Sequence, residues 1–572
     1  MKCRLFSFAA VPALLLPLTA SAAPYASAVT DAGANISFVL NEPADSVRVV
    51  FNEPLPALEM GALAAGPHTF PKGASTSFQI VVEKNAGPGW KSGVLQQISD
   101  DTSELVKFTN CLGLAVNRKP DTGKLFGRVY VSCSQNGTAA PVTTPVSPSR
   151  AIQEGIYVLN AGLAATELGS GALLGGLTFS TPATGADGAS PYRLSVGDKG
   201  DLFIADWSDA SGSVYKTDGD VANGKNVLGG PTIALKPPLP EGTLHGSIAG
   251  MVTSGSEQGG DLKLWVVDED LQDDPTSATP TMINSIWAWD TAGAPLPIET
   301  PPLRFNIDNN IGINFATQTA DLAQGPDGTF YKTQRRAAGN ESGVFALDAD
   351  GNTLSSVPPS EEGEPVFGSK GAFQIYSGVS PAADPFLETR GCDVSADGWL
   401  ALIRSDNAIH LVKVDAGVID FDSHILLHTK PTTIIGRDIA FDAAGNLYTI
   451  SSGQSLLRVF SPGGHTRATT SSSGAFTITD VTPAVPAPRM ELQPVVTGLT
   501  ASGADYTLQV TSRLGLASTL TVQRSPDLGS EEEWETLLTT EYTITGDAPN
   551  FTVLIKEAAR GESRYFYRVR RL

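Results

Sequence analysis

The sequence predicts an all-β protein whose middle region is a tandem array of small antiparallel sheets. Three observations indicate this class. A two-strand phrase recurs along the chain, with an alternating apolar strand, a turn rich in Gly and Asp, and a second alternating strand. Glycine and proline are abundant, at 58 and 39 of 572 residues, which disfavours long helices. Hydrophobic residues make up 41% of the chain and charged residues only 17%, so the chain can fill a core and is not a disordered polymer.

The two-strand phrase occurs six times in recognisable form. The copies cover residues 112–132, 192–208, 245–268, 321–333, 390–406 and 437–452. Several copies continue into a third alternating segment, and these segments lie at 155–161, 212–218, 285–291, 343–352, 409–415 and 456–464. Units of this size in tandem are typical of a β-propeller, in which each unit forms one blade. The copies predict six blades, or seven if one copy is too diverged to recognise.

One copy also carries a family pattern. The segment IAFDAAGNLYTI, at 439–450, places an Asp after an apolar strand, then a Gly-Asn turn, then Leu-Tyr in the second strand. This pattern resembles the NHL-like propeller repeat, and the resemblance extends over a predicted propeller domain at 100–481. It implies the fold and no single function, because related propellers include binding platforms, scaffolds and a minority of enzymes.

Two small β-sandwich domains are predicted beside the propeller. Residues 30–90 contain ISFVL, DSVRVVFN, LAAGPHTF and TSFQIVVEK, which resemble the immunoglobulin-like sandwich of the flagellar-hook-capping family. A Pro-rich linker at 482–489 precedes residues 490–572. Those residues contain VQRSPDL and YFYRV, which are similar to fibronectin-type-III-like terminal domains of exported bacterial proteins. That resemblance implies that Trp534 and Tyr567 are core residues.

The start of the chain has the pattern of a signal peptide. The basic segment Met1–Arg4 is followed by the apolar segment Leu5–Thr19 and by an Ala20-Ser21-Ala22 cleavage site. We therefore expect a signal peptide at 1–22 and an exported protein of bacterial type, secreted or at the cell surface. No later apolar run is long enough to span a membrane, so membrane insertion is not expected. The net charge of −21 argues against nucleic acid as a partner.

Export permits a disulfide bond. Cys111 opens the strand-like run CLGLAV and Cys133 closes FGRVYVSC, with the turn KPDTGK between them. If the hairpin is symmetric about that turn, the two cysteines lie opposite each other within bridging reach. The sequence thus predicts a disulfide between Cys111 and Cys133, and two buried thiols are the alternative. Cys392 is predicted to be a small core residue.

Familiar catalytic motifs are missing from the sequence. It contains no H-E-x-x-H, no C-x-x-C, no G-x-S-x-G and no G-x-G-x-x-G after a strand. We therefore select candidate site residues by their place in the predicted fold. Propellers bind ligands at the mouth of the central channel, where the inner strands begin. Aligning the copies places six residues at equivalent positions there, and these are Gly113, Arg193, Ser247, Asp321, Gly391 and Asp438.

Charged residues at or next to these positions are predicted to converge on the channel axis. They are Arg193, Asp321, Arg390, Asp393, Arg437 and Asp438. One interpretation is a ring of salt bridges that holds the channel shut, because buried carboxylates need cationic partners. A second is a polar pocket for a small anionic or sugar ligand. A third is general acid–base catalysis by Asp321 or Asp393.

Two further features are candidates for binding. Trp207, within ADWSD, is predicted either to stack on a sugar ring or to cap the gap between two blades. The acidic segment 266–277 offers carboxylates that suit calcium, and the candidate ligands are Asp268, Asp270, Asp273 and Asp274. Because the segment lacks the spacing of a known calcium loop, a solvated acidic insertion is the alternative. No other cofactor is predicted.

These features favour an exported binding or scaffold protein that holds a polysaccharide or a surface protein on one propeller face. The alternative is a propeller hydrolase, lactonase or lyase that acts on a small or sugar substrate at the central channel, with calcium as its cofactor. The two hypotheses differ in one geometric feature. An enzyme needs a channel carboxylate that is not paired with an arginine and that faces an open pocket.

Overall fold

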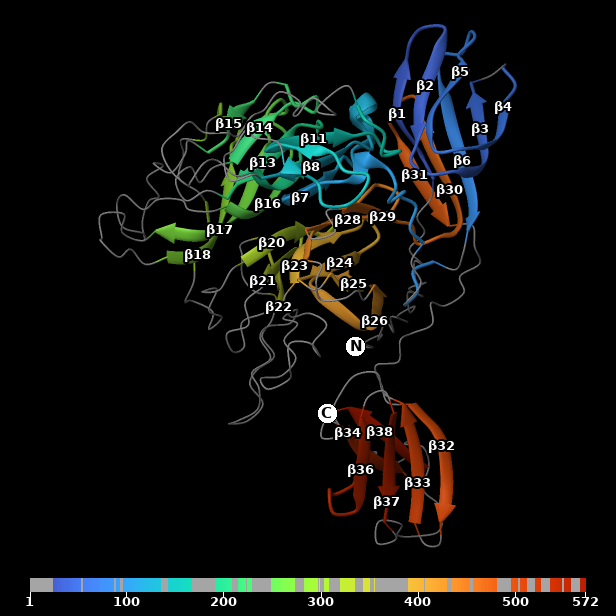
Figure 1. Cartoon of the computed structure of the whole chain (residues 1–572), viewed down its shortest axis with the longest axis vertical. Coiled ribbons are helices and arrows are strands. Elements are labelled where there is room, and N and C mark those ends of the chain that lie inside the picture. Colours follow the sequence, from blue (N-terminus) through green and yellow to red (C-terminus); the bar gives the residue numbers. More distant parts are fainter. Residues whose placement is uncertain are drawn as a thin grey trace, which may run out of the picture. The chain divides into compact units, whose positions relative to one another are not determined.

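The computed structural model describes most of the chain (Figure 1). The described residues are 24–52, 55–86, 89–92, 96–134, 142–166, 191–207, 214–222, 224–228, 248–272, 282–296, 298, 303–307, 319–334, 343–349, 354, 389–405, 407–428, 435–452, 456–480, 495–502, 505–511, 520–525, 535–547, 550–556 and 566–571. The chain divides into two compact units, and the main boundary falls between Ala487 and Pro488. The predicted signal peptide at 1–22 and the linker at 482–489 lie outside the described residues.

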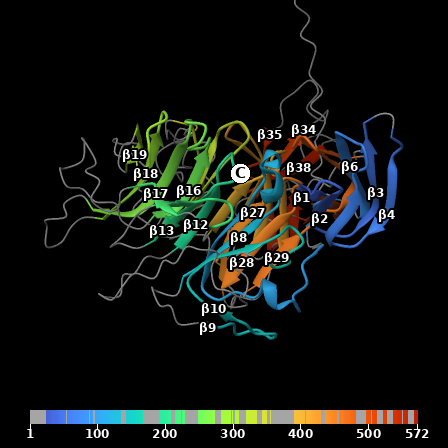
Figure 2. The ribbon, with the colours of Figure 1, turned by 90° about the horizontal axis from the view of Figure 1, so that it is seen from above.

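Nearly all regular structure is β-strand, as predicted, and it begins with a two-sheet sandwich (Figure 2). One sheet has the order β1-β2-β5, with bounds Ala26–Asp31, Asn35–Leu40 and Gly66–Pro71. The other has the order β31-β30-β6-β3-β4, with bounds Phe476–Asp480, Gly464–Ser471, Phe78–Ala86, Ala44–Phe51 and Leu58–Leu63. Buried side chains of both sheets, among them Phe38, Val49 and Ile80, form one core. The alternation of buried apolar and more exposed residues, clearest on β2, explains this packing.

β30 and β31 belong to this sandwich and not to the propeller domain in which the sequence analysis placed them. β30 and β31 lie inside the segment 100–481 that was predicted as propeller, yet β30 pairs along its whole length with β6. The N-terminal sandwich is therefore completed by chain that returns after the last propeller sheet. Period-2 alternation shows that a segment is a strand but not which sheet it joins, which is why the sequence did not reveal this pairing.

Six further antiparallel sheets follow one another within the described residues, each starting with an inner strand. The first three have the orders β7-β8-β11 (Cys111–Val116, Val129–Cys133, Gly155–Leu159), β12-β13-β14-β15 (Pro191–Val196, Leu202–Asp206, Val214–Thr217, Lys225–Asn226) and β16-β17-β18-β19 (Ile248–Ser254, Lys263–Gln272, Met282–Asp290, Leu303–Ile307). The others are β20-β21-β22 (Thr319–Gln324, Phe330–Gln334, Gly343–Leu347), β23-β24-β25-β26 (Thr389–Val394, Trp399–Arg404, Ile409–Asp415, Val418–His428) and β27-β28-β29 (Ile435–Phe441, Leu447–Ser452, Leu456–Phe460).

The inner strands form a closed ring. β7, β12, β16, β20, β23 and β27 each contact the next, and β27 contacts β7. Figure 1 shows β7, β16, β20 and β23 on the inside of the group and β15, β18, β22 and β26 toward its outside. This is the predicted β-propeller. Each sequence repeat forms one of its sheets, and glycines in the turns allow the first two strands to form a hairpin. In the turns after β20, β23 and β27, Gly328, Gly398 and Gly445 have φ of 87°, 78° and 80°, which glycine adopts without strain.

The first unit also contains four short elements outside the sandwich and the propeller sheets. The remaining elements of the first unit are η1 (Glu104–Val106), η2 (Pro120–Leu125), β9 (Val142–Thr143) and β10 (Ala151–Ile152).

The second unit has two sheets, in the orders β32-β33-β37-β36 and β35-β34-β38. Their bounds are Val495–Ser502, Asp505–Thr511, Asn550–Ile555 and Tyr542–Asp547, then Glu535–Thr536, Leu520–Ser525 and Phe566–Arg571. Leu508, Val522 and Phe551 belong to its core, and Tyr567 lies on β38, whereas Trp534 is outside the described residues. Within the described part of the chain, no helix is long and apolar enough to cross a membrane.

The predicted hairpin register of the first propeller sheet is correct, but the predicted disulfide is not present. Cys111 and Cys133 are direct partners on β7 and β8, as expected. Both thiols are nevertheless free and buried. The Sγ of Cys111 contacts the carbonyl oxygen of Ser451 on β28 at 3.6 Å, so this thiol is directed toward the neighbouring sheet. A break in the β7–β8 register immediately after Cys111 accompanies this orientation. Cys392 is buried, as predicted.

An aromatic cluster joins the N-terminal sandwich to the propeller. The ring of Tyr25 lies 5.3 Å from that of Phe126 and 5.6 Å from that of Phe476, measured between centroids. Ala444, in the turn after β27, belongs to the same core. Next to it, the buried Asp442 accepts backbone hydrogen bonds from Ala444 and Asn446, both at 2.9 Å. Burial raises the pKa of Asp442 from 3.8 to about 6.

The raised pKa of Asp442 predicts a pH-dependent stability. The folded protein keeps a proton on Asp442 that the unfolded chain releases, so this contribution is present at low pH and lost as the pH rises through about 6. Between pH 7 and pH 5 the free energy of unfolding should rise by about 1 kcal/mol more in the wild type than in Asp442→Asn. Urea unfolding of both proteins at the two pH values measures this difference, and parallel pH profiles would contradict it.

Candidate functional site

Six equivalent positions on the inner strands form a ring layer around the channel axis. In ring order they are Gly113, Arg193, Gly250, Asp321, Gly391 and Asp438. Glycine therefore alternates with a charged residue from one sheet to the next. Five of these positions agree with the sequence alignment. The third does not, because Ser247 lies outside the described residues and the register of β16 with β17 places Gly250 in the layer. The long turn of that copy explains the offset of three residues.

The glycines are needed because neighbouring inner strands approach closely there. A Cβ atom on Gly113 would lie 1.9 Å from the carbonyl oxygen of Tyr192. A Cβ on Gly391 would lie 2.9 Å from the Cα of Asp438. These contacts leave no room for any side chain, so the three charged side chains alone fill the centre of the layer.

Arg193 is the hub of this layer. Its Nη1 donates to the carbonyl oxygens of Leu112 at 2.7 Å and Arg437 at 3.0 Å, and its Nη2 donates to the carbonyl oxygen of Arg390 at 2.6 Å. The same guanidinium pairs with two carboxylates, Asp438 Oδ2 at 3.1 Å and Asp321 Oδ1 at 3.5 Å. Its side chain is only 3% exposed. Arg193 thus links inner strands of four other sheets across the axis and closes the channel there.

Each channel carboxylate also joins two adjacent sheets through backbone hydrogen bonds. Oδ1 of Asp321 accepts from the following residue, and Oδ2 accepts from the N–H of Cys392 on the next inner strand at 3.0 Å. Asp393 and Asp438 repeat this geometry, accepting from Phe441 at 2.6 Å and from Leu114 at 2.7 Å respectively. One short acidic side chain therefore bridges each of three successive sheet junctions.

The electrostatics of the ring layer follow from burial and pairing. Burial raises the pKa of both Asp321 and Asp438 above the usual aspartate value, and Arg193 opposes this effect. Burial by itself would lower the pKa of Arg193. The two carboxylates outweigh that effect, and the pKa of Arg193 lies above its ordinary value. Arg193, Asp321 and Asp438 thus form a buried ion-pair cluster.

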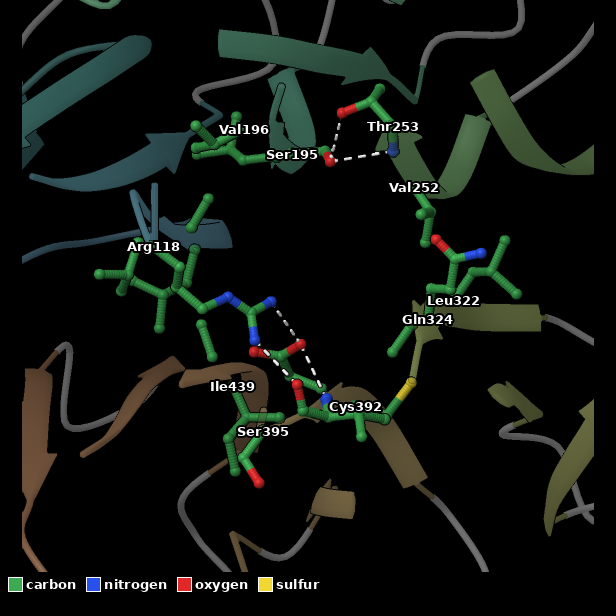
Figure 3. A pocket seen from close by; sticks show the side chains of 18 of the residues that line it. Arg118, Ser195, Val196, Val252, Thr253, Leu322, Gln324, Cys392, Ser395 and Ile439 are labelled. Atoms are coloured by element: carbon green, nitrogen blue, oxygen red, sulfur yellow. Dashed lines mark hydrogen bonds and ion pairs between the residues drawn. The ribbon is translucent and has the colours of Figure 1, made fainter. Parts of the chain in front are cut away.

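A pocket of about 470 Å³ lies on one side of the ring layer. Its lining includes Arg193, Asp321 and Asp438 together with residues that follow the layer on the inner strands. Figure 3 shows Ser195, Thr253, Leu322 and Cys392 around this space, with the side chain of Arg118 extending into it. We call this side the pocket end, and the side where the inner strands begin the strand-start end.

The predicted site residues separate between the two ends. Asp393 lines the pocket with the three charged residues of the ring layer. Arg390 and Arg437 precede the layer and lie at the strand-start end, where each Nε donates to a serine of its own hairpin, Ser405 at 2.8 Å and Ser452 at 2.9 Å.

Trp207 also lies at the strand-start end. It follows β13 and is 40% exposed. Its ring stacks on Tyr192 at 5.4 Å between centroids, with 26° between the planes. It therefore covers a neighbouring ring of its own sheet. Arg390, Arg437 and Trp207 are therefore separate from the four predicted residues that line the pocket, Arg193, Asp321, Asp393 and Asp438.

Several polar pocket residues were not predicted from the sequence. Arg118 donates from Nη2 to Oδ1 of Asp393 at 2.9 Å and from Nη1 to the carbonyl oxygen of Val394 at 2.8 Å. Ser195 and Thr253 share a hydrogen bond of 2.8 Å between their hydroxyls. Gln324 lies on the opposite wall (Figure 3). All of these residues follow the ring layer by two or more positions, so an alignment focused on the strand starts did not include them.

The acidic segment considered for calcium begins in a strand and not in a loop. Asp268 is a buried residue of β17, and Asp270 lies on the same strand. Asp273 and Asp274 are outside the described residues. Among the residues that the structure describes, no group of three or more His, Cys, Asp or Glu side chains could hold a metal ion. Calcium binding at this segment stays a prediction.

Comparison with known proteins gives only distant structural similarity. No protein-family model matches the chain, and no curated protein matches it. Solved structures that resemble it include a protein of unknown function from Bacteroides thetaiotaomicron, at 12% identity and a TM-score of 0.31, which covers 78% of this chain and 100% of that one. The WD40 β-propeller domain of Doa1 has 10% identity and a TM-score of 0.30 over 66% of this chain and 98% of that one. A glucose dehydrogenase has 13% identity and a TM-score of 0.36 over 65% and 99%. Similarities of this size indicate neither a family nor an activity.

Proposed function

We propose that this propeller protein is exported and binds an acidic polysaccharide at its strand-start end. The observation that carries the proposal is the presence of an exposed aromatic stack and two repeated arginines at that end. The N-terminal pattern at residues 1–22 supports export. The acidic net charge of −21 makes a local cationic site on this protein unusual, because most of the surface repels anions.

The aromatic part of the site is Trp207 on Tyr192. An indole that is 40% exposed is costly to leave in water, and its face offers a flat apolar surface to the C–H face of a sugar ring. The stack on Tyr192 holds the indole in one orientation. A pre-oriented aromatic ring loses little conformational entropy when it binds a ligand.

The cationic part of the site consists of Arg390 and Arg437. They occupy the same position on consecutive inner strands, and each Nε is held by the serine at the end of the next strand. Arg193 donates to the carbonyl oxygens of both residues, which keeps the two backbones close together. Two guanidinium groups at neighbouring positions suit the carboxylates of an acidic sugar polymer, because the planar fork of N–H groups matches a carboxylate.

The alternative, a hydrolase, lactonase or lyase at the channel, has less support. Asp321, Asp393 and Asp438 each accept two backbone hydrogen bonds and each pair with an arginine. A carboxylate whose oxygens already accept these bonds has few lone pairs left for contact with a substrate. No observation at the site favours catalysis over binding.

Polygalacturonate is the probe for this proposal. We expect saturable binding that weakens with salt, and at least tenfold weaker binding to its methyl-esterified form, which lacks the charge. Trp207→Ala and the double variant R390Q/R437Q should each lose about tenfold or more in affinity, measured by calorimetry. Arg48→Gln is the matched control, since Arg48 is an exposed arginine of the N-terminal sandwich. No binding of polygalacturonate, or equal affinities of R390Q/R437Q and R48Q, would refute the proposal.

A further inference from the structure

We infer that the pocket end is a second, separate binding site, which takes a small aliphatic carboxylate with Arg118 as its anchor. The site is independent of the polysaccharide proposal because the ring layer separates the two ends. The side chains of Arg193, Asp321 and Asp438 are 3%, 7% and 4% exposed, so a ligand in the pocket does not reach the strand-start end.

The anchor is a guanidinium that crosses the pocket. Arg118 follows β7 in the first sheet, yet its contacts are with Asp393 and Val394 on β23 in the fifth. It therefore passes over the sixth sheet, where the small residue Ala440 lines the pocket beneath it. These contacts use two of the five N–H groups that a guanidinium carries. The side chain is 36% exposed, so it is open to a ligand entering from the pocket end.

Among the residues that line the pocket, the exposed charged side chains are cations. Asp393 has an 11% exposed side chain against 36% for Arg118, and its two backbone hydrogen bonds would remain if the guanidinium turned toward a ligand. Lys119, also in the lining, is 42% exposed but is paired with Asp198. The accessible charged group inside the pocket is therefore the guanidinium of Arg118, and a carboxylate is the group that fits a guanidinium best.

The walls carry aliphatic and polar side chains side by side. Val116, Val196, Val252, Leu322 and Ile439 line the cavity together with several alanines, and Ser195, Thr253 and Gln324 add polar groups. Phe476 is the sole aromatic side chain in the described lining. A cavity of about 470 Å³ falls within the size range of small-molecule sites. Aliphatic side chains near one cationic anchor suit a short hydrocarbon chain that ends in a carboxylate.

Hexanoate, hexanamide and acetate are the three probes. We expect saturable binding of hexanoate to the full-length purified protein by calorimetry. Hexanamide lacks the charge and acetate lacks the chain, so each should bind at least tenfold more weakly. Arg118→Gln should lose at least tenfold in hexanoate affinity while polygalacturonate binding is unchanged. Arg48→Gln is the matched control, because Arg48 is an exposed arginine outside the pocket lining, and this variant should bind hexanoate as the wild type does.

A second variant tests the cavity without touching the anchor. Val252→Phe fills part of the space and leaves the Arg118–Asp393 pair in place, so it should also lose hexanoate binding. The inference is overturned if hexanoate shows no saturable binding, if hexanamide binds equally well, or if R118Q retains wild-type affinity. Because polygalacturonate binding is measured on the same proteins, failure at this site is distinguishable from failure at the strand-start end.

Discussion

Replacing Arg193 by Leu should destabilise the first unit by about 3–5 kcal/mol, because it leaves two buried carboxylates without their cation. The guanidinium pairs with Asp321 and Asp438 and donates to three carbonyl oxygens on other inner strands. Leucine supplies none of these donors. Breaking this buried network should lower the free energy of unfolding several times more than breaking a surface ion pair.

Urea unfolding followed by tryptophan fluorescence measures this effect. Arg467→Leu is the control, since Arg467 pairs with Glu83 on the surface and is 49% exposed, and it should cost less than about 1 kcal/mol. The R193L protein should also regain stability as the pH falls from 7 to 5. Burial raises the pKa of Asp321 and Asp438, and without the arginine these groups take up protons more readily in the folded state. A loss below 1 kcal/mol in R193L would show that the ring layer is not what holds the inner strands together.

Gly113→Ala should be the most damaging of the small substitutions, at about 3 kcal/mol or more. The new Cβ would lie 1.9 Å from the carbonyl oxygen of Tyr192 and 2.7 Å from Oγ of Ser132. The first of these atoms belongs to the backbone, so no rotamer change relieves the clash. The first and second sheets would have to move apart, which would also stretch the bond from Ser132 to Tyr192.

Gly250→Ala is the matched comparison because it lies in the same ring layer. Its Cβ would come no closer than 3.0 Å to a neighbouring atom, the backbone nitrogen of Leu322. We expect a loss of about 1 kcal/mol in this variant. The urea midpoints of both variants against wild type provide the test. Equal losses in the two variants would contradict the close approach of β7 to β12.

Sequence reasoning worked where local pattern determines structure. Alternation and turn glycines indicated the first three strands of the propeller sheets, because these signals repeat every few dozen residues. The alignment also identified five of the six residues in the ring layer. The alignment failed at the third sheet. It predicted Ser247 in the ring layer, but Gly250 occupies that position, because the turn between β16 and β17 is longer than in the other copies. An insertion in a turn changes the spacing without changing the alternation, so the pattern alone could not detect it.

The two ends of the channel could not be distinguished from the sequence. Arg390 and Arg437 precede the ring layer by one position and Asp393 follows it by two, which is a small difference in sequence. In the fold it places them on opposite sides of a sealed layer. Arg118 was missed for a related reason, since its partner Asp393 is 275 residues away in the chain.

The all-β class, the repeated sheets and the charged residues near the start of four inner strands could be predicted from the sequence alone. Three features became visible only in the folded chain: β30 and β31 return to the N-terminal sandwich, Cys111 and Cys133 are free, and the pocket lies beyond the ring layer. The difference lies in the sequence separation over which each interaction acts. Periodicity and turn chemistry act over a few residues and are visible in the chain. Strand pairing across hundreds of residues, thiol orientation and pocket lining depend on which surfaces meet when the ring of sheets closes.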